Sequence, residues 1–462
     1  MGIATSFLSG IFLWSGFAPI EFPLGPYVGM VLLYRSLLNR SIKTRLLHSF
    51  IAGASLFLPL LHWSSSYVGW IPWVSLAILQ TMIFTLIGLL PIRRDFSSIW
   101  LFAASFTVIE LIRMKYPFGG FGWGRIGHTQ VDLLPGIYSI VGIAGISFFI
   151  AFVAGAIALL RFRIIALAPL PILASIFIPN IASTDSLKIV AVQGGVDELG
   201  LDYNSRALSV LKRHAQTTRL ISSNPQLVVW PENASDIDPL NSAEAAKIIS
   251  ETLNEVRAPL LVGAVLQSEA GPKNVSILYE SNSEIASMYV KQDLAPFGEY
   301  IPIRSIAEFI APEAKRVRDF QPGERWIHHE IAGSRFQSII CFEVLDDDFL
   351  RTGLKDSQFT VAQTNNATFG KSPQARQQLQ IIRARAAEFQ RDFAVVSTTG
   401  FTAHINGRGE ITDSLDQFDS GILEMEVETR SGETLASGIN SWFWLGIFIL
   451  ALIANRRSVF AR

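Results

Sequence analysis

Charged residues are scarce in this sequence, and cysteine is almost absent. Only 17% of the 462 residues are charged, whereas about a quarter are charged in an ordinary soluble domain. Hydrophobic residues account for 50%, and the mean hydropathy is +0.35. This composition excludes a disordered or fibrous chain and disfavours a purely soluble enzyme. The single cysteine, Cys341, excludes an intrachain disulfide and therefore a disulfide-rich secreted scaffold.

Signals for metal, nucleotide and serine chemistry are also missing. The seven histidines are scattered, and the one adjacent pair, His328-His329, lacks the spacing of metal ligands. The sequence contains no phosphate-binding loop, and no Gly-x-Ser-x-Gly elbow supplies a serine nucleophile. We therefore expect neither a metal nor a cofactor.

The two signs of charge are concentrated in different parts of the chain. Residues 184–433 hold 24 Lys/Arg against 35 Asp/Glu, while the two flanks together hold 14 against 4. An acidic segment of net charge −11 therefore lies within a basic frame of +10, although the whole chain carries only −1. This asymmetry argues against nucleic acid as the main partner.

The basic flanks contain the long apolar runs. A membrane-spanning helix needs about 20 mostly apolar residues, and we expect seven spans before the acidic segment and one after it. The first run could instead be a signal peptide, but it has no basic residues before it, and Phe17-Ala18-Pro19 is a poor cleavage site. The predicted spans are Ile3–Ile20, Leu24–Leu38, Leu46–Trp63, Trp70–Leu90, Ser97–Met114, Ile137–Leu160, Ile164–Pro179 and Ser441–Ala454.

The basic residues of the loops predict the orientation of the chain. Eleven Lys/Arg residues follow spans two, four, six and eight, whereas three follow span five. The positive-inside rule then places both termini in the cytoplasm and the acidic segment outside. We expect a membrane domain over residues 1–182, an extracytoplasmic domain over 183–434, and a last span with a cytoplasmic tail over 435–462.

The acidic segment alternates strand and helix patterns. Runs rich in Val, Ile and Leu are separated by polar helical patterns, which indicates buried strands in an α/β sandwich. The predicted strands are Leu187–Gln193, Leu227–Pro231, Pro259–Leu266, Val275–Tyr279, Ile285–Val290, Phe336–Cys341, Phe359–Gln363, Phe393–Ser397, Ala403–Ile405 and Gly421–Val427. The predicted helices are Tyr203–Ser222, Asn241–Val256 and Pro373–Phe389.

Two features near the fifth span have competing interpretations. Residues 116–130 are rich in glycine and aromatic residues, which is typical of an interfacial aromatic belt, but Arg125 and His128 could belong to a lipid-headgroup or lid surface. Glu110 is an ionisable residue at membrane depth and so a functional candidate. A local ion pair with Arg113, three residues further on, is the simpler interpretation.

Polar residues follow three of the predicted strands. Glu232 comes directly after an apolar strand, Lys291 ends another, and a loop stiffened by proline and glycine then presents Glu299. Cys341 ends a third apolar strand, with Glu343 two residues later. Each segment alone has an ordinary interpretation: a solvated carboxylate, a surface lysine in a turn, or a cysteine buried as a small hydrophobic residue.

Together, the three segments supply the groups for acyl transfer. A cysteine thiolate is the nucleophile, and a glutamate can take the thiol proton and later deprotonate an incoming amine. A lysine ammonium can stabilise the oxyanion of the tetrahedral intermediate. The combination therefore favours a cysteine-dependent enzyme over three unrelated surface features.

The order and spacing of these residues resemble a known family. Trp-Pro-Glu at 230–232, Tyr-x-Lys-x-x-Leu-x-Pro-Phe-Gly-Glu-Tyr-x-Pro at 289–302 and Cys-Phe-Glu at 341–343 resemble the nitrilase superfamily. More closely, they resemble the apolipoprotein N-acyltransferases, bacterial membrane enzymes that finish lipoprotein maturation. The resemblance covers nearly the whole chain. It implies a polytopic α-helical membrane domain of about eight spans carrying an external α/β nitrilase-like sandwich domain.

The resemblance also implies roles for individual residues. Glu232 would be the general base, Lys291 would stabilise the oxyanion, and Cys341 would carry the acyl group as a thioester. Glu299 would support Lys291 and the nucleophile. Further supporting or substrate-binding positions in the matching motifs are Trp230, Asn233, Phe297, Phe342 and Glu343.

The implied reaction takes place at a bacterial cytoplasmic (inner) membrane, with the catalytic domain on the periplasmic, extracytoplasmic side. A phospholipid would donate a fatty acyl chain to Cys341, and the α-amino group of a diacylglyceryl-cysteine at the N-terminus of an apolipoprotein would accept it. The resemblance implies phosphatidylethanolamine-like donors, and we expect a monomer embedded in the membrane with no nucleic-acid partner.

The chain departs from the family pattern at several positions. Phe342 stands where tyrosine is usual, Thr368 where tryptophan is usual, and Gln378 where histidine is usual. A tryptophan expected near Asp202 is absent. These departures leave the Glu232, Lys291 and Cys341 positions intact and concern contacts with the acyl chain and the peptide.

Two other functions remain as alternatives. One is a membrane-anchored nitrilase-like amidase that releases a free acid, although one span suffices for an anchor. The other is a transporter or receptor without catalysis, which would need polar residues inside the spans. The predicted spans hold almost no ionisable residues, which disfavours a transport path.

Overall fold

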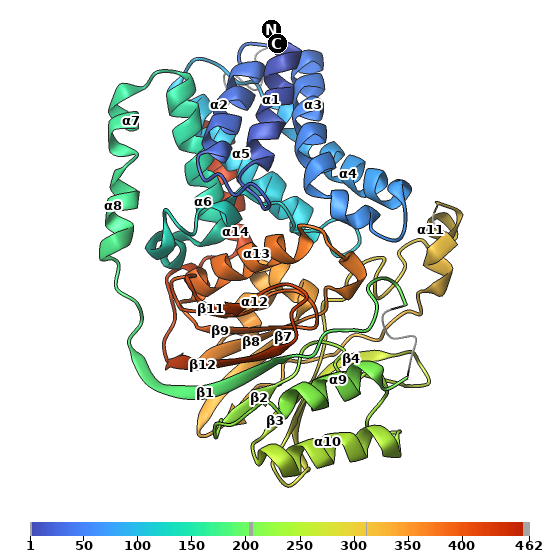
Figure 1. The fold of residues 1–462 in the computed structure, drawn as a ribbon. Coiled ribbons are helices and arrows are strands. Elements are labelled where there is room, and N and C mark those ends of the chain that lie inside the picture. The colour runs from blue at the N-terminus through green and yellow to red at the C-terminus, as the bar shows by residue number, and fades with distance from the viewer. Residues whose placement is uncertain (1, 203–206, 311, 456–462) are drawn as a thin grey trace.

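The computed structural model describes residues 2–202, 207–310 and 312–455. A bundle of helices forms one half of the molecule and two stacked β-sheets form the other (Figure 1). The first eight helices and the last one, α14 (Ser441–Ala454), make up the bundle, and the long strand β1 (Ser183–Gln193) leads from α8 (Leu170–Phe177) into the sheets. The bundle thus lies directly against one side of the sheet sandwich.

The helices of the bundle are built from the apolar runs. Polar side chains cap the starts of three of them. Ser41 accepts from the Thr44 amide before α3 (Ile42–Leu60), Asp95 from the Ser98 amide before α5 (Phe96–Lys115), and Asn440 from the Phe443 amide before α14. The helices are α1 (Gly2–Trp14), α2 (Gly25–Leu37), α3 (Ile42–Leu60), α4 (Trp70–Thr85), α5 (Phe96–Lys115), α6 (Pro135–Ala158), α7 (Phe162–Leu167), α8 (Leu170–Phe177) and α14 (Ser441–Ala454).

Three helical segments in the described part of the chain are long and apolar enough to cross a membrane. They are Trp70–Leu89, Phe96–Lys115 and Pro135–Ala158. Gly2–Trp14, Phe162–Phe177 and Ser441–Ala454 are shorter apolar helical segments. The run predicted as one span over Ile164–Pro179 forms two short helices, because Pro169 and Pro171 begin a new helix after α7.

The acidic segment forms two six-stranded sheets with the same internal plan. The first has the order β12-β1-β2-β3-β4-β5 and the second β11-β10-β9-β8-β7-β6, with a parallel three-stranded group inside each. The first-sheet strands are β1 (Ser183–Gln193), β2 (Leu227–Val229), β3 (Leu260–Leu266), β4 (Lys273–Tyr279), β5 (Ile285–Val290) and β12 (Gly421–Arg430). The second-sheet strands are β6 (His329–Ile331), β7 (Ser334–Ile340), β8 (Phe359–Thr364), β9 (Phe393–Ser397), β10 (Thr402–Ile405) and β11 (Ile411–Leu415).

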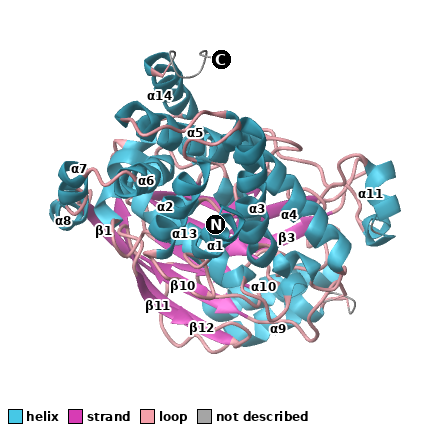
Figure 2. Cartoon of the chain, turned by 90° about the horizontal axis from the view of Figure 1, so that it is seen from above, coloured by secondary structure: helices cyan, strands magenta, loops and turns pink. Residues whose placement is uncertain are grey.

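The two sheets bury a common core and each is covered by helices on its outer face. Side chains such as Val229, Phe336 and Val396 fill the space between the sheets. The other helices of this half are α9 (Ser209–Thr218), α10 (Ala243–Val256), α11 (Arg304–Ile310), α12 (Asp347–Gly353) and α13 (Gln374–Phe389). Helices α9 and α10 cover the first sheet, and α13 lies between the second sheet and the bundle (Figures 1 and 2).

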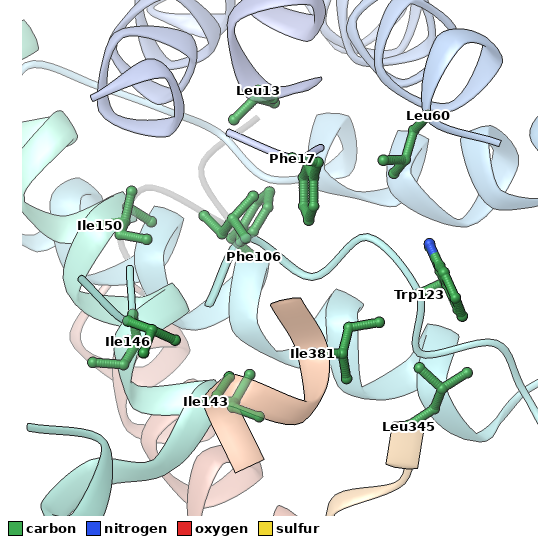
Figure 3. Close-up of a cluster of buried hydrophobic side chains, with 14 of the residues drawn as sticks. Leu13, Phe17, Leu60, Phe106, Trp123, Ile143, Ile146, Ile150, Leu345 and Ile381 are labelled. Atoms are coloured by element: carbon green, nitrogen blue, oxygen red, sulfur yellow. The ribbon is translucent and has the colours of Figure 1, made fainter. Parts of the chain in front are cut away.

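Helix α13 has almost no solvent-facing side, because one core cluster continues from the sheet into the bundle. Figure 3 shows Ile381 of α13 between Ile143 of α6, Trp123 and Leu345. The same cluster includes Phe17 from the loop after α1. The two halves are therefore joined by apolar packing and not only by the connecting strand.

Most predicted strands and helices are confirmed, with shifts at their ends. The helix predicted over Tyr203–Ser222 is described only as α9, and residues 203–206 lie outside the described part. The prediction missed the short strands β6 and β11 and the short helices α11 and α12, because elements of three to seven residues have too little periodicity to recognise. The strand predicted to include Cys341 ends one residue earlier, at Ile340.

The interpretations of the segment around the fifth span need correction. Arg125, His128 and Trp123 are buried between the bundle and the sheets, so this part of the 116–130 loop is not an interfacial belt. Glu110 does not pair with Arg113: it lies 3.8 Å from Arg125 Nε and accepts from the Ile126 amide at 2.8 Å. The loop folds back over the helix, and spacing along one helix could not reveal that partner.

Candidate active site

The three predicted polar segments meet at one edge of the sandwich. Glu232 follows β2, Lys291 follows β5 in the same sheet, and Cys341 follows β7 in the opposite sheet. Lys291 is held against β4, since its amide donates to the carbonyl of Asn274 at 2.9 Å. Polar groups at strand ends of facing sheets can share a site without any strand carrying an interior charge.

Glu232, Lys291 and Glu299 form a buried charged cluster. Lys291 Nζ lies 2.8 Å from Glu299 Oε2 and 3.5 Å from Glu232 Oε1. The side-chain amide of Asn274 donates to Glu232 Oε1 at 2.8 Å and to Glu299 Oε1 at 2.9 Å. The backbone amide of Ala295 donates to Glu299 Oε2 at 2.8 Å. One cation and one amide therefore hold two carboxylates side by side.

Burial and mutual interaction set the charges of this cluster. Burial raises the pKa of Glu232, and the Lys291 ammonium opposes this shift without cancelling it. Burial would lower the pKa of Lys291, but the Glu299 and Glu232 carboxylates outweigh it, so the net pKa is raised. Lys291 therefore stays protonated at neutral pH, while Glu232 is poised to accept a proton.

Cys341 lies on a sharp turn at the end of β7. Its φ is +50°, in the left-handed region that residues with a Cβ rarely adopt. It begins the 3-10 turn Cys341–Leu345, and its side chain is half-buried. Burial, and secondly the Glu232 carboxylate, raise the pKa of the thiol to about 12, against the opposing effect of Lys291. The thiol is thus protonated at rest and needs a base.

Glu343 fixes this turn to the loop that follows Lys291. Its carboxylate accepts from Tyr289 Oη at 2.7 Å, from the Gln292 amide at 2.9 Å and from the Ile340 amide at 2.7 Å. Burial raises the pKa of Glu343 to about 7. The side chain joins the end of β5 to the end of β7, which sets the spacing of Lys291 and Cys341.

The other predicted positions have different surroundings. Trp230 is fully buried against α9 and donates to Thr218 Oγ1 at 2.9 Å, so its ring lies in the core. Asn233 has φ +56° directly after Glu232. Phe297 is 50% exposed at the tip of the loop between Lys291 and Glu299.

Phe342 lies between the cysteine turn and the bundle. Its ring centroid is 6.2 Å from that of Phe121, which stacks in turn on Trp123 at 6.2 Å. Trp123 contacts Trp63 at 5.1 Å between centroids. A chain of contacting aromatic rings therefore leads from Phe342 to two loops of the bundle.

Two sets of polar contacts tie the bundle to the sheet half next to the cysteine turn. In the first, Trp63 and Trp123 donate to Gln377 Oε1 at 3.1 and 2.7 Å, and Gln377 Nε2 donates to the Ala18 carbonyl at 3.0 Å. One α13 side chain therefore contacts three separate loops of the bundle.

The second set is a buried ionic network centred on Arg385 of α13. Arg385 donates to the Val344 carbonyl at 2.8 Å, to Asp347 at 2.8 Å and to Glu388 at 2.7 Å. Asp347 also pairs with Arg125 of the 116–130 loop. Glu388 accepts from an α6 amide, at Ile143, directly after the break of that helix at Gly142. The end of the cysteine turn is thereby anchored to both halves.

The sequence prediction overlooked Asn274 and the contacts of Gln378. Asn274 is a polar residue at the start of an apolar strand, and that anomaly could have marked it. Gln378 Nε2 lies 3.5 Å from Cys341 Sγ, although in sequence it stood out only as a departure from a family pattern. Among the described residues, no group of three or more His, Cys, Asp or Glu side chains could hold a metal ion.

The comparisons with known proteins agree with this architecture. Residues 9–156 match the family model described as the apolipoprotein N-acyltransferase N-terminal domain, and residues 191–435 match the carbon-nitrogen hydrolase family. An apolipoprotein N-acyltransferase of Mycolicibacterium smegmatis is 29% identical over 93% of this chain and 80% of its own length. One of Vibrio cholerae is 25% identical over 96% and 95%.

A solved CN-hydrolase superfamily structure from Xanthomonas campestris has 16% identity and a TM-score of 0.41, covering 60% of this chain and 95% of its own. The carbon-nitrogen hydrolase match alone spans more than half of the chain. The chain therefore belongs to the carbon-nitrogen hydrolase (nitrilase) superfamily and, within it, to the apolipoprotein N-acyltransferases.

Proposed function

We propose that this enzyme moves a fatty acyl chain from a membrane phospholipid, through a thioester on Cys341, to the α-amino group of the diacylglyceryl-cysteine of an apolipoprotein. The observation that carries the proposal is the buried Glu232–Lys291–Glu299 cluster with Cys341, located where the sheets meet the apolar bundle. The acyltransferase names of the relatives support the same reaction class.

The first half-reaction forms the acyl-enzyme. The Cys341 thiol proton passes to the Glu232 carboxylate as Sγ attacks the ester carbonyl carbon, and the Lys291 ammonium stabilises the oxyanion. When the tetrahedral intermediate collapses, the ester C–O bond breaks. The leaving oxygen of the lysophospholipid takes the proton from Glu232, so Glu232 returns to its ionised form.

The second half-reaction transfers the acyl group to nitrogen. The neutral α-amine attacks the thioester carbonyl carbon, and Glu232 takes a proton from that nitrogen. The C–S bond then breaks, and the thiolate recovers the proton from Glu232. The products are an amide and a free Cys341 thiol, and the same carboxylate has acted as base and then acid in both halves.

We propose the membrane arrangement that this reaction needs. Residues 1–182 provide seven spans, residues 183–434 form the catalytic domain on the periplasmic side of the inner membrane, and residues 435–462 close with a last span and a cytoplasmic tail. The three long apolar helical segments and three shorter ones support a bundle embedded in a membrane. Both lipid substrates then approach from the outer half of the bilayer, and the enzyme acts as a monomer.

The test is product analysis with the full chain in detergent. The donor is phosphatidylethanolamine with a labelled acyl chain, and the acceptor is a synthetic diacylglyceryl-cysteine peptide with a free α-amine. We expect the peptide to gain one labelled acyl group, and we expect Cys341→Ala to lose this product. A peptide with an acetylated α-amine is the matched control and should remain unlabelled.

A membrane-anchored amidase is the second candidate, favoured only by the shared fold of the superfamily. It would use water in place of the amine. Labelled free fatty acid with no labelled peptide would therefore contradict the transferase proposal and favour hydrolysis.

A further inference from the structure

Gln378 contacts the sulfur atom of the proposed nucleophile. It lies on the second turn of α13, and its Nε2 is 3.5 Å from Cys341 Sγ and 3.4 Å from the Cys341 carbonyl oxygen. Both acceptors belong to the residue with the left-handed backbone at the end of β7. Neither proposed half-reaction uses this amide.

The hydrogen bonds around Gln378 determine which end of its amide faces the sulfur. The Cys341 carbonyl oxygen can only accept, so the Gln378 atom 3.4 Å from it is the amide nitrogen. On the other side, the Gly400 amide donates to Ser397 Oγ at 2.8 Å, and Ser397 donates to Asn366 Oδ1 at 2.8 Å. The Asn366 amide nitrogen must then donate, and it reaches Gln378 Oε1 at 2.9 Å. The Gln378 N–H group is therefore directed at Cys341.

This relay is buried throughout. Gln378 and Asn366 are each 2% exposed, and Ser397 is 0% exposed. Asn366 also donates to Gln374 Oε1 at 2.6 Å, so both of its amide hydrogens are used. Turning the Gln378 amide would place its oxygen against the Cys341 carbonyl and its nitrogen against the Asn366 nitrogen, so both of those hydrogen bonds would be lost. The donor at Cys341 is thus held in place before any substrate arrives.

We propose that Gln378 is a further catalytic residue, whose neutral amide donates a hydrogen bond to Cys341 Sγ and stabilises the negative charge that develops there. The inference rests on the proposed function, since it takes Cys341 as the nucleophile. As the thiol proton passes to Glu232, the charge on Sγ is met by the Gln378 N–H, and the amide keeps both of its protons.

A neutral donor suits this position. Lys291 already supplies a cation, and the two carboxylates near it accept from it and from Asn274. An amide donates without titrating in the working range, so it can stabilise the charge on Sγ while the proton goes to Glu232. The hydrogen bond to the Cys341 carbonyl also holds the turn that aims the sulfur.

The test measures the thiol and the acyl-enzyme separately in the full chain in detergent. Cys341 is the only cysteine, so iodoacetamide reports on that thiol alone, and labelled phosphatidylethanolamine reports on thioester formation. For Gln378→Met we expect both rates to fall by about 10- to 100-fold, which is the value of a hydrogen bond to a charged group. The KM for the phospholipid should stay within about threefold, since a donor at the sulfur acts on the developing charge.

Two further variants separate this role from a structural one. Gln378→His keeps a ring N–H donor and should recover part of both rates. Asn366→Asp presents acceptors to Gln378, so the amide should turn its nitrogen away from Cys341, and both rates should fall although Gln378 is unchanged. Gln380→Met makes the same change two residues along α13, at a side chain that donates to Gly16, and should react like the wild type.

Unchanged alkylation and acylation in Gln378→Met, with normal thermal unfolding, would overturn the inference. Equal losses in Gln378→Met and Gln380→Met would also overturn it, because general loosening of α13 would then explain the effect. Normal alkylation without any acyl-enzyme in the wild type would count against the proposed function alone. Alkylation needs no lipid, so it tests Gln378 in either case.

Discussion

Replacing Lys291 by methionine should make the stability of the enzyme depend strongly on pH. The Lys291 side chain is 2% exposed and pairs with two carboxylates, at 2.8 Å from Glu299 and 3.5 Å from Glu232. Methionine fills a similar volume but carries no charge. The two carboxylates then keep their hydrogen bonds to the Asn274 side-chain amide but have lost their cation. Breaking a buried ion pair in this way costs roughly 3–5 kcal/mol while the remaining charges persist.

The sign of the pH dependence follows from proton uptake. Without Lys291, the opposing effect on the already raised pKa of Glu232 is lost, so that pKa rises further above its ordinary value of 4.5. A raised pKa in the folded state contributes stability below the unfolded pKa, and this is lost as pH rises through the folded pKa. The variant should therefore lose less stability at about pH 4.5 than near pH 8, where the full loss is expected.

The assay is thermal or denaturant unfolding of the full chain in detergent, followed by tryptophan fluorescence at both pH values. Lys212→Met is the matched control, because Lys212 pairs with Glu244 while both side chains are at least 51% exposed. An exposed pair contributes under about 1 kcal/mol. An equal loss for Lys291→Met at both pH values would refute the reasoning, since it would mean that Glu232 does not take up a proton.

Three further predictions concern other buried groups. Glu232→Gln should slow thioester formation by about 10²- to 10⁴-fold through loss of the base, and a decrease below tenfold in a labelled-lipid assay would contradict that role. Glu343→Gln should weaken the dependence of the unfolding free energy on pH. The pKa of Glu343 is about 7 in the folded enzyme and 4.5 in an unfolded chain, so its contribution to stability is present below pH 4.5 and is lost as the pH rises through about 7. An unchanged pH dependence of unfolding in the variant would contradict this pKa shift. Arg385→Met should cost roughly 3–5 kcal/mol on unfolding by leaving Asp347 and Glu388 short of a cation, and a loss no larger than that of Lys212→Met would be inconsistent with the network.

The parts of the site that follow strand ends could be predicted from the sequence. Glu232, Lys291 and Cys341 each come after an apolar run, and apolar runs mark buried strands whose ends meet at a sheet edge. Glu299 could be found because its loop is short and stiff. These features are local in sequence, so periodicity and turn chemistry reveal them.

The parts that depend on contacts between distant segments could not be predicted. Glu110 pairs with Arg125 because a loop folds back over its helix, and Gln378 faces Cys341 because a helix crosses the end of a strand 37 residues earlier. The burial of residues 122–130 is likewise set by packing between two halves of the molecule. None of these contacts leaves a periodic trace in the sequence.

The number of membrane crossings can likewise be predicted only in part from the sequence. Proline and short length divide the predicted seventh span into α7 and α8, and α1 ends at Trp14, well before the predicted Ile20. Apolar composition identifies which segments can enter a bilayer, but turns within them depend on their neighbours.

The most direct test of the account is the intact mass of the purified enzyme in detergent with mixed bacterial phospholipids, before and after neutral hydroxylamine. We expect a mass gain of one fatty acyl group that hydroxylamine removes and that Cys341→Ala never shows, because Cys341 is the only thiol in the chain. No adduct with any lipid, or the same adduct in Cys341→Ala, would contradict the proposed nucleophile and the mechanism built on it.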